Sequence, residues 1–100
     1  MSTLHILNTG LLQAARLDRL LLTASSGDHL MLTEDAVIWA CSTELGSRLQ
    51  QAGLELTVSA LQPDLQARGL ESRILPDIAC VEDAAFVQAV CTCQRVLSWF

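Results

Sequence analysis

The feature that most constrains this chain is a repeated alternation of short apolar, β-prone runs with segments whose apolar residues recur at helical spacing. Runs such as residues 3–7 have the length of strands, whereas Leu17, Leu20 and Leu21 fall on one face of a helix. Parallel strands need a crossover connection, which is usually a helix. The alternation therefore predicts an α/β fold: a three-layer αβα domain with a mainly parallel five-stranded sheet.

The boundaries of these elements follow from apolar runs and from turn residues. We expect strands at residues 3–7, 28–33, 54–60, within 77–81 and at 94–100, and helical segments at 11–25, 34–39, 42–53, 63–69 and 82–91. Gly53 and Gly69 follow helical segments as stop signals, and Pro76 delays the fourth strand to Asp77 or beyond. Asp64 is expected to cap the short helix in which it lies. No linker or repeat divides the chain, so residues 1–100 are expected to form one domain.

The composition is unusually apolar for so small a domain. Hydrophobic residues make up 51% of the chain and charged residues 17%, against about 25% charged in an average protein. A small domain has a high surface-to-volume ratio and should be more polar than average. We therefore expect part of the apolar surface to be covered by a partner subunit.

The charge distribution excludes several classes of partner. The net charge is −5, and the six basic residues are scattered arginines, so no basic stripe exists for nucleic acid. No apolar run is long enough to span a membrane. The first residues lack the basic region of a secretory signal. We therefore expect a cytoplasmic protein that binds neither nucleic acid nor membranes directly.

The carboxyl ends of the first two predicted strands are where an α/β fold tends to bind ligands. The first turn, at residues 7–11, has a single glycine, Gly10, and lacks a phosphate-binding glycine motif, so a plain turn is expected. Glu34 and Asp35 follow the second strand and could hold a cation or exchange protons, but capping and solvation explain them as well. No cofactor or metal is predicted. A homo-oligomeric module that binds a small ligand near Asn8 and Glu34 stays open as an alternative.

The four cysteines are candidate nucleophiles. Cys80 ends an apolar strand and is expected in the core, and Cys41 is expected to be a reduced thiol. Cys91 and Cys93 could relay sulfur or bind a metal. Residues two apart on a helix point about 200° apart, and no second cysteine pair exists. Buried or half-buried thiols are expected, with a sulfur carrier as the alternative.

The histidines and aromatic residues have structural explanations. His5 and His29 lie in predicted strands, where hydrogen-bonded structural roles are expected. Trp39 is expected either in the core or as an interface anchor. Trp99 and Phe100 are expected to dock on the chain's own sheet or on a neighbouring subunit, because large aromatic side chains are costly to leave in water.

Several segments together resemble the TusB/DsrH family of sulfur-relay subunits. The most specific is residues 64–70, Asp-Leu-Gln-Ala-Arg-Gly-Leu, which is similar to the family's Asp-Leu-x-Ala-Arg-Gly signature. Four other segments match the family in order. The first is Leu4-His5 together with Asn8, and the second is Gly27 followed by an apolar strand and then Glu34-Asp35. The third is Asp83 with Phe86-Val87, and the last is Trp99. The chain departs from the family at Thr9-Gly10, where a Ser-Pro is common, and at Ala36, where Gly is usual. Residues 11–24 also lack the cysteine that some members carry.

The resemblance implies a DsrEFH-like fold of the Rossmann/flavodoxin-like type and a role in a complex. Family members assemble with homologous TusC/TusD-like or DsrE/DsrF-like subunits into a heterohexamer, in which another subunit carries the sulfur-accepting cysteine. Sulfur then flows to the wobble 2-thiouridine of tRNA or into sulfur oxidation. We therefore expect a non-catalytic, structural subunit of a sulfurtransferase complex.

The resemblance and the aromatic residues together give candidates for the subunit interface. These are Trp39, Arg68, Trp99 and Phe100, with no catalytic residue apart from the alternative sulfur carriers Cys91 and Cys93. Arg68 is one of only six cations on an acidic chain. We expect it to make a structural ion pair or a subunit contact.

Overall fold

Five strands, all parallel, form one sheet at the centre of a computed structural model that describes residues 2–100. The strands are β1 (Thr3–Leu7), β2 (His29–Leu32), β3 (Thr57–Leu61), β4 (Ala79–Val81) and β5 (Arg95–Trp99), and their order across the sheet is β4-β3-β2-β1-β5. This confirms the predicted α/β class with a parallel sheet.

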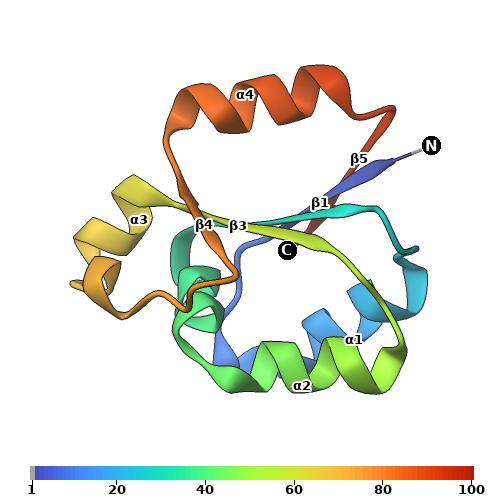
Figure 1. The fold of residues 1–100 in the computed structure, drawn as a ribbon, viewed down its shortest axis with the longest axis horizontal. Coiled ribbons are helices and arrows are strands. Elements are labelled where there is room, and N and C mark those ends of the chain that lie inside the picture. Colours follow the sequence, from blue (N-terminus) through green and yellow to red (C-terminus); the bar gives the residue numbers. More distant parts are fainter. Residues whose placement is uncertain (1) are drawn as a thin grey trace.

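The order of the strands explains where the helices lie. From β1 to β4 each connection moves one strand in the same direction, and the last connection returns across the sheet to β5. Right-handed crossovers place connections that run in opposite directions on opposite faces. Figure 1 shows α1 and α2 on one face and α4 alone on the other, with α3 beside the end of β3. The helical segments are η1 (Leu11–Gln13), α1 (Ala14–Thr23), η2 (Glu34–Cys41), α2 (Thr43–Ala52), α3 (Gln62–Ala67), η3 (Glu71–Arg73) and α4 (Asp83–Thr92).

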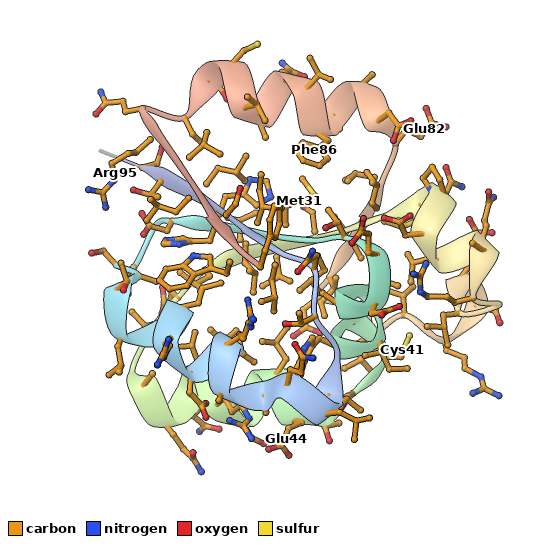
Figure 2. The ribbon with its side chains drawn as sticks, turned by 180° about the vertical axis from the view of Figure 1, so that it is seen from behind. Met31, Cys41, Glu44, Glu82, Phe86 and Arg95 are labelled. Atoms are coloured by element: carbon orange, nitrogen blue, oxygen red, sulfur yellow. The ribbon has the colours of Figure 1, made fainter. Side chains whose placement is uncertain are left out.

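The two faces of the sheet have cores of very different size. The larger core lies between the sheet and α1, α2 and η2, and is built largely from leucines, with Trp39 as one of its buried members. The smaller core lies beneath α4 and consists of Leu4, Ile6, Met31 and Ala89. Figure 2 shows Phe86 pointing from α4 toward Met31 and the sheet. Burial of apolar surface therefore stabilises the α1/α2 side far more than the α4 side.

Most predicted boundaries agree with the structure to within a few residues. Ser42 caps α2 by accepting a hydrogen bond from the N–H of Glu44, and Gly53 ends that helix with a left-handed backbone. Three predictions need adjustment. The segment at 34–39 is a 3₁₀ helix, η2, extending to Cys41, and the first helix begins with the 3₁₀ turn η1. The third strand begins only at Thr57, because residues 54–56 form the loop that follows α2.

Candidate functional site

The carboxyl ends of β1 and β2 meet, as the parallel sheet requires, and bring together the turn after β1 and the acidic pair after β2. The hydroxyl and the backbone N–H of Thr33 both donate to the carbonyl oxygen of Leu7, at 3.2 and 3.0 Å. The side-chain amide of Asn8 donates to Glu34 Oε2 at 3.3 Å. Gly10 packs closely here, because a Cβ on it would lie 3.1 Å from the carbonyl oxygen of Asp35, tighter than an ordinary contact. The single glycine of the first turn thus permits close packing between the two loops.

Helix α3 joins this edge through the two charged residues of the 64–70 segment. Asp64 Oδ2 accepts a hydrogen bond from the backbone N–H of Glu34 at 2.7 Å. Arg68 forms an ion pair with Asp35, with Nη2 and Nε at 2.9 and 3.2 Å from Oδ1. Of the two roles predicted for Arg68, a structural ion pair or a subunit contact, the structure contains the ion pair. The prediction that Asp64 caps its own helix is wrong, because it lies inside the first turn of α3 and instead caps the start of η2. We call Asn8, Glu34, Asp35, Asp64 and Arg68 the carboxyl-edge network.

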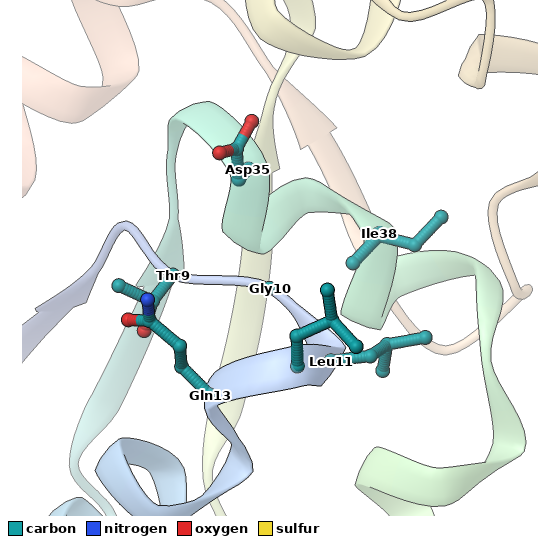
Figure 3. A pocket seen from close by; sticks show the side chains of 7 residues that line it. Thr9, Gly10, Leu11, Gln13, Asp35 and Ile38 are labelled. Carbon is teal, nitrogen blue, oxygen red and sulfur yellow. The ribbon is translucent and has the colours of Figure 1, made fainter.

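A shallow pocket of about 340 Å³ opens beside this network. It is lined by Thr9, Gly10, Leu11, Leu12, Gln13, Asp35 and Ile38. Figure 3 shows Leu11 and Ile38 on one side of the pocket and the carboxylate of Asp35 above it. Asn8 Oδ1 and Thr9 Oγ1 are buried at this edge without a hydrogen-bond partner. Nothing in the sequence indicated that Thr9 lines a pocket, because threonine is common in turns of many kinds.

The lining of this pocket determines which contacts it can make. Its lining includes a carboxylate, an amide, a hydroxyl and apolar side chains, but no thiol or imidazole. Within residues 2–100, no cluster of His, Cys, Asp and Glu side chains has the geometry to hold a metal ion. The pocket therefore offers polar and apolar contacts to a bound molecule or to a neighbouring chain.

Both histidines are held by hydrogen bonds, as predicted. His5 is fully buried, with Nε2 3.0 Å from Asp28 Oδ2 and Nδ1 accepting from the indole N–H of Trp99 at 3.1 Å. Because Nδ1 accepts, the ring proton resides on Nε2 and is donated to Asp28. His29 Nε2 lies 2.9 Å from Ser59 Oγ, and burial lowers the pKa of His29. The sequence did not predict that Asp28 is buried and accepts these hydrogen bonds. The only feature that distinguishes it in the sequence is its position at the start of a strand.

The cysteines lie apart from one another and from the pocket. Cys80 is exposed, so the prediction that it belongs to the core is wrong: β4 is a three-residue strand at the edge of the sheet. Cys91 is exposed as well, so the prediction of a buried or half-buried thiol there is wrong, because only one face of α4 meets the sheet. Cys93 and Cys41 are half-buried, as expected for structural thiols. The polypeptide thus offers two accessible thiols, on β4 and on α4.

The aromatic interface candidates separate into different environments. Trp39 is 1% exposed and donates its indole N–H to the carbonyl oxygen of Thr9 at 3.1 Å. The interface assignment of Trp39 is therefore corrected: its ring fills the chain's own core. Trp99 docks on the chain's own sheet against His5, whereas Phe100 is 64% exposed. Of the aromatic candidates, Phe100 retains a large surface for a partner.

Membrane insertion can be judged from helix length and hydrophobicity. Among residues 2–100, no helix combines the length and the apolar character that crossing a bilayer requires.

Comparison with known proteins gives concordant matches in sequence and in structure. A family model described as "DsrH like protein" matches residues 12–96. Protein TusB of Pectobacterium parmentieri is 35% identical over 86 residues, which cover 85% of this chain and 88% of that protein. Protein TusB of Sodalis glossinidius (strain morsitans) is 34% identical over 86 residues, covering 86% and 90%. The crystal structure of the ychN protein from E. coli superposes with a TM-score of 0.64 at 15% identity, covering 98% of this chain and 99% of that one. At this identity the structural match concerns the fold alone.

Proposed function

Because this chain belongs to the DsrH family, whose curated relatives here are TusB proteins, we propose that it is a non-catalytic subunit of a sulfur-relay complex. In this role it supports persulfide transfer by partner subunits and carries no sulfur itself. The observation that carries the proposal is the environment of its thiols. A sulfur acceptor reacts as a thiolate, which is favoured by neighbouring cations or by a helix N-terminus.

Two of the thiols are held in the protonated form by their surroundings. Although the Cys80 side chain is exposed, partial desolvation by its neighbours raises its pKa, and the carboxylates of Glu71 and Glu82 raise it further. Burial also raises the pKa of Cys41, against a smaller opposing effect of Arg73. The Cys41 thiol donates to the carbonyl oxygen of Leu70 at 3.7 Å. Neither group is prepared for nucleophilic attack on a persulfide.

The other two thiols lie at the wrong end of their helix. Cys91 is in the last turn of α4, and Cys93 follows its last residue. This end of a helix carries partial negative charge, so the backbone gives a thiolate no stabilisation there. The exposed position of Cys91 is the one feature that favours the second candidate function, a direct persulfide carrier.

The surface near the pocket supports a partner role. Leu12 lies fully in solvent and Leu11 is exposed beside it, and both line the pocket together with Ile38. Exposed leucines on a 100-residue chain of high apolar content are typical of a surface that another protein covers. The partners we propose are homologous subunits of the TusC/TusD or DsrE/DsrF type, in a cytoplasmic heterohexamer. The sulfur would pass to tRNA wobble 2-thiouridine or into sulfur oxidation.

The test is persulfide labelling of the reconstituted complex. The chain is combined with its two homologous partner subunits, and a cysteine desulfurase supplies sulfur-35 from labelled cysteine. We expect the label on a partner subunit, with unchanged transfer when Cys41, Cys80, Cys91 or Cys93 is replaced singly by serine. Label that resides on this chain and disappears in Cys91→Ser or Cys93→Ser would establish the carrier role instead.

A second measurement concerns the partner surface. Leu12→Asp places a charge in the proposed contact and should weaken assembly with the partner subunits, as measured by co-purification and mass photometry. Arg16→Gln, an exposed change on the neighbouring helix α1, is a control that keeps the apolar surface. Full assembly of the Leu12→Asp variant would place the partner elsewhere.

A further inference from the structure

The order of the strands reverses at β1. The connection that leaves β1 leads to β2 on one side of it, whereas β5, which the chain reaches last, lies on the other side. In open α/β sheets the usual ligand site is the crevice outside the carboxyl ends of the strands where the order reverses. The carboxyl ends of β1 and β5 are therefore the place in this fold where a ligand is expected. The pocket beside Asp35 lies on the other side of β1, toward β2.

A second pocket, of about 420 Å³, opens at this reversal point. It lies between the carboxyl end of β5 and the first half of α1, two elements that pack against each other. Its lining residues are Ala15, Arg16 and Arg19 on α1 and Ser98, Trp99 and Phe100 at the end of the chain. One side of the pocket is therefore cationic and the other is aromatic.

Arg16 and Arg19 have no counter-charge among residues 2–100. They are three residues apart, so both guanidinium groups lie on the same side of α1. No acidic group of the described chain forms an ion pair with either of them. The nearest acid in the sequence, Asp18, pairs instead with Arg48 on α2. On a chain of net charge −5, the two arginines form a local concentration of positive charge that a bound anion would neutralise.

The position of Arg16 strengthens the case for an anion. Arg16 lies in the first turn of α1, where the helix dipole makes a cation unfavourable, and that turn contains no acidic residue. An anion between Arg16 and Arg19 would offset both the repulsion between the two side chains and the interaction of Arg16 with the dipole. Guanidinium groups also present paired N–H donors that match the oxygens of a phosphate or carboxylate.

The aromatic side of the pocket favours a planar ring next to that anion. Phe100 is 64% exposed, although a large aromatic side chain is costly to leave in water. The indole of Trp99 is held in one orientation by its hydrogen bond to His5 Nδ1 at 3.1 Å. Aromatic side chains stack with planar rings of many kinds, because every such ring presents a π-face. Ser98 adds a hydroxyl group to the same lining.

We propose that this pocket binds a small organic anion, a planar ring that carries a phosphate or carboxylate group. The anionic group lies between Arg16 and Arg19, and the ring lies against Phe100 and Trp99. A volume of about 420 Å³ is sufficient for a ligand of the size of a mononucleotide. A polyanion such as RNA is disfavoured, because two cations on a chain of net charge −5 neutralise too few phosphates. The proposal does not rest on the relay function or on the partner surface at Leu12.

NMR titration of the full chain tests the site. The probes are adenosine monophosphate (AMP) and phenylacetate, which present the anion as a phosphate and as a carboxylate. We expect shifts of the Trp99 indole N–H and of the amides of Arg16, Arg19 and Ser98. The Kd of the better probe should be about 0.1–1 mM, since the residues that line the pocket are largely exposed. The tighter of the two probes identifies the anionic group that the pocket prefers.

The two halves of AMP test whether the anion and the ring are both bound. Inorganic phosphate and adenosine should each bind about tenfold more weakly than AMP, because each makes only one of the two contacts. Phe100→Ala should weaken the binding of AMP about fivefold through the loss of stacking, and should leave the binding of inorganic phosphate unchanged.

Paired arginine substitutions test the anion contact. Arg16→Gln/Arg19→Gln should weaken the binding of AMP about tenfold, because both charge-assisted contacts to the phosphate are lost. Arg73→Gln/Arg95→Gln removes the same amount of charge from two exposed arginines outside the pocket lining. This matched control should bind AMP like the wild type. The spectra of both double variants also show whether each is folded.

Three results would overturn the proposal. One is the absence of shifts in the pocket with either ring-bearing probe at concentrations up to about 10 mM, well above the expected Kd. Another is equal binding of AMP and inorganic phosphate, which would mean that an ion merely associates with surface arginines. The third is an Arg16→Gln/Arg19→Gln variant that binds AMP as tightly as its matched control, since the anion would then lie elsewhere. None of these results affects the persulfide-labelling test of the relay role.

Discussion

Glu34 has the most unusual backbone conformation in the described chain: it is the one non-glycine residue there with a positive φ, at 50°. A left-handed conformation costs an L-residue about 1 kcal/mol. The conformation is held from three sides, since its N–H bonds Asp64, its carboxylate accepts from Asn8, and its neighbour Asp35 pairs with Arg68. Such strain is common where loops build a binding surface.

Because of this strain, we expect glycine to be more stabilising than alanine at position 34, the reverse of their order in a regular helix. Glu34→Gly and Glu34→Ala both remove the carboxylate, but only glycine relaxes the backbone. We expect the glycine variant to be about 1 kcal/mol more stable than the alanine variant in urea unfolding. In a regular helix alanine is the more stabilising residue, so an alanine variant that equals or exceeds the glycine variant would contradict the observed φ.

Asp28 provides the clearest pH dependence at the scale of a single residue. Burial opposes ionisation of this carboxyl, but hydrogen bonds from the Ser25 backbone, from His5 and from the Thr3 backbone prevail, and its pKa lies below the ordinary 3.8. A carboxyl whose pKa is depressed by folding stabilises the folded state above its unfolded pKa. That contribution is lost as the pH falls from about 3.8 through the lower folded value.

The corresponding experiment compares the wild type with Asp28→Asn. At pH 7 the variant should be destabilised by about 1–3 kcal/mol, because the buried His5 N–H and two backbone N–H groups lose their charged acceptor. The difference should shrink as the pH is lowered below 3.8. Urea unfolding at a series of pH values measures it, and a difference that is constant from pH 7 to pH 3 would rule out this linkage.

At the scale of elements, the carboxyl-edge network couples α3 to η2. Asp64 lies on α3 but caps η2, at 2.7 Å from the Glu34 nitrogen. Asp64→Ala should therefore cost about 1 kcal/mol, as loss of a cap does, and Asp64→Asn less. Arg68→Ala should cost no more than about 0.5 kcal/mol, since its ion pair with Asp35 is largely exposed.

Hydrogen exchange at the Glu34 amide distinguishes a local cap from a general loss of stability. In Asp64→Ala this amide should exchange faster, while amides in the middle of α2 keep their protection relative to global unfolding. If the Glu34 amide is as protected in the alanine variant as in the wild type, Asp64 does not act as its acceptor.

The elements also show which parts of the structure could be predicted from the sequence and which could not. Strand and helix order follow from periodicity and from local signals such as Ser42 and Gly53, which act within a few residues. The roles of Asp64 and Trp39 depend on partners about 30 residues away, Glu34 and Thr9. The exposure of Cys80 depends on β4 being an edge strand, which the apolar pattern of a single strand does not encode. Arg68 was predicted to form either an ion pair or a subunit contact; it forms an ion pair, and its partner Asp35 was not identifiable from the sequence.

At the scale of the whole molecule, the dominant property is the inequality of the two faces of the sheet. One face carries the large leucine-rich core, and the other carries α4 over Leu4, Ile6, Met31 and Ala89. On that side β5 is an edge strand whose residues are exposed or half-buried. Local stability follows buried apolar contacts. The segment from α4 to the end of β5 should therefore be the least stable cooperative unit of the fold.

Native-state hydrogen exchange should reveal this unit. In dilute solution, amides of α4 should exchange through a partial opening with a lower free energy than global unfolding, whereas amides of β1 and β2 should exchange only by global unfolding. Equal protection of α4 and β1 in the dilute wild type would contradict this prediction. It would mean that the small core stabilises the α4 face of the sheet as strongly as the leucine-rich core stabilises the α1/α2 face.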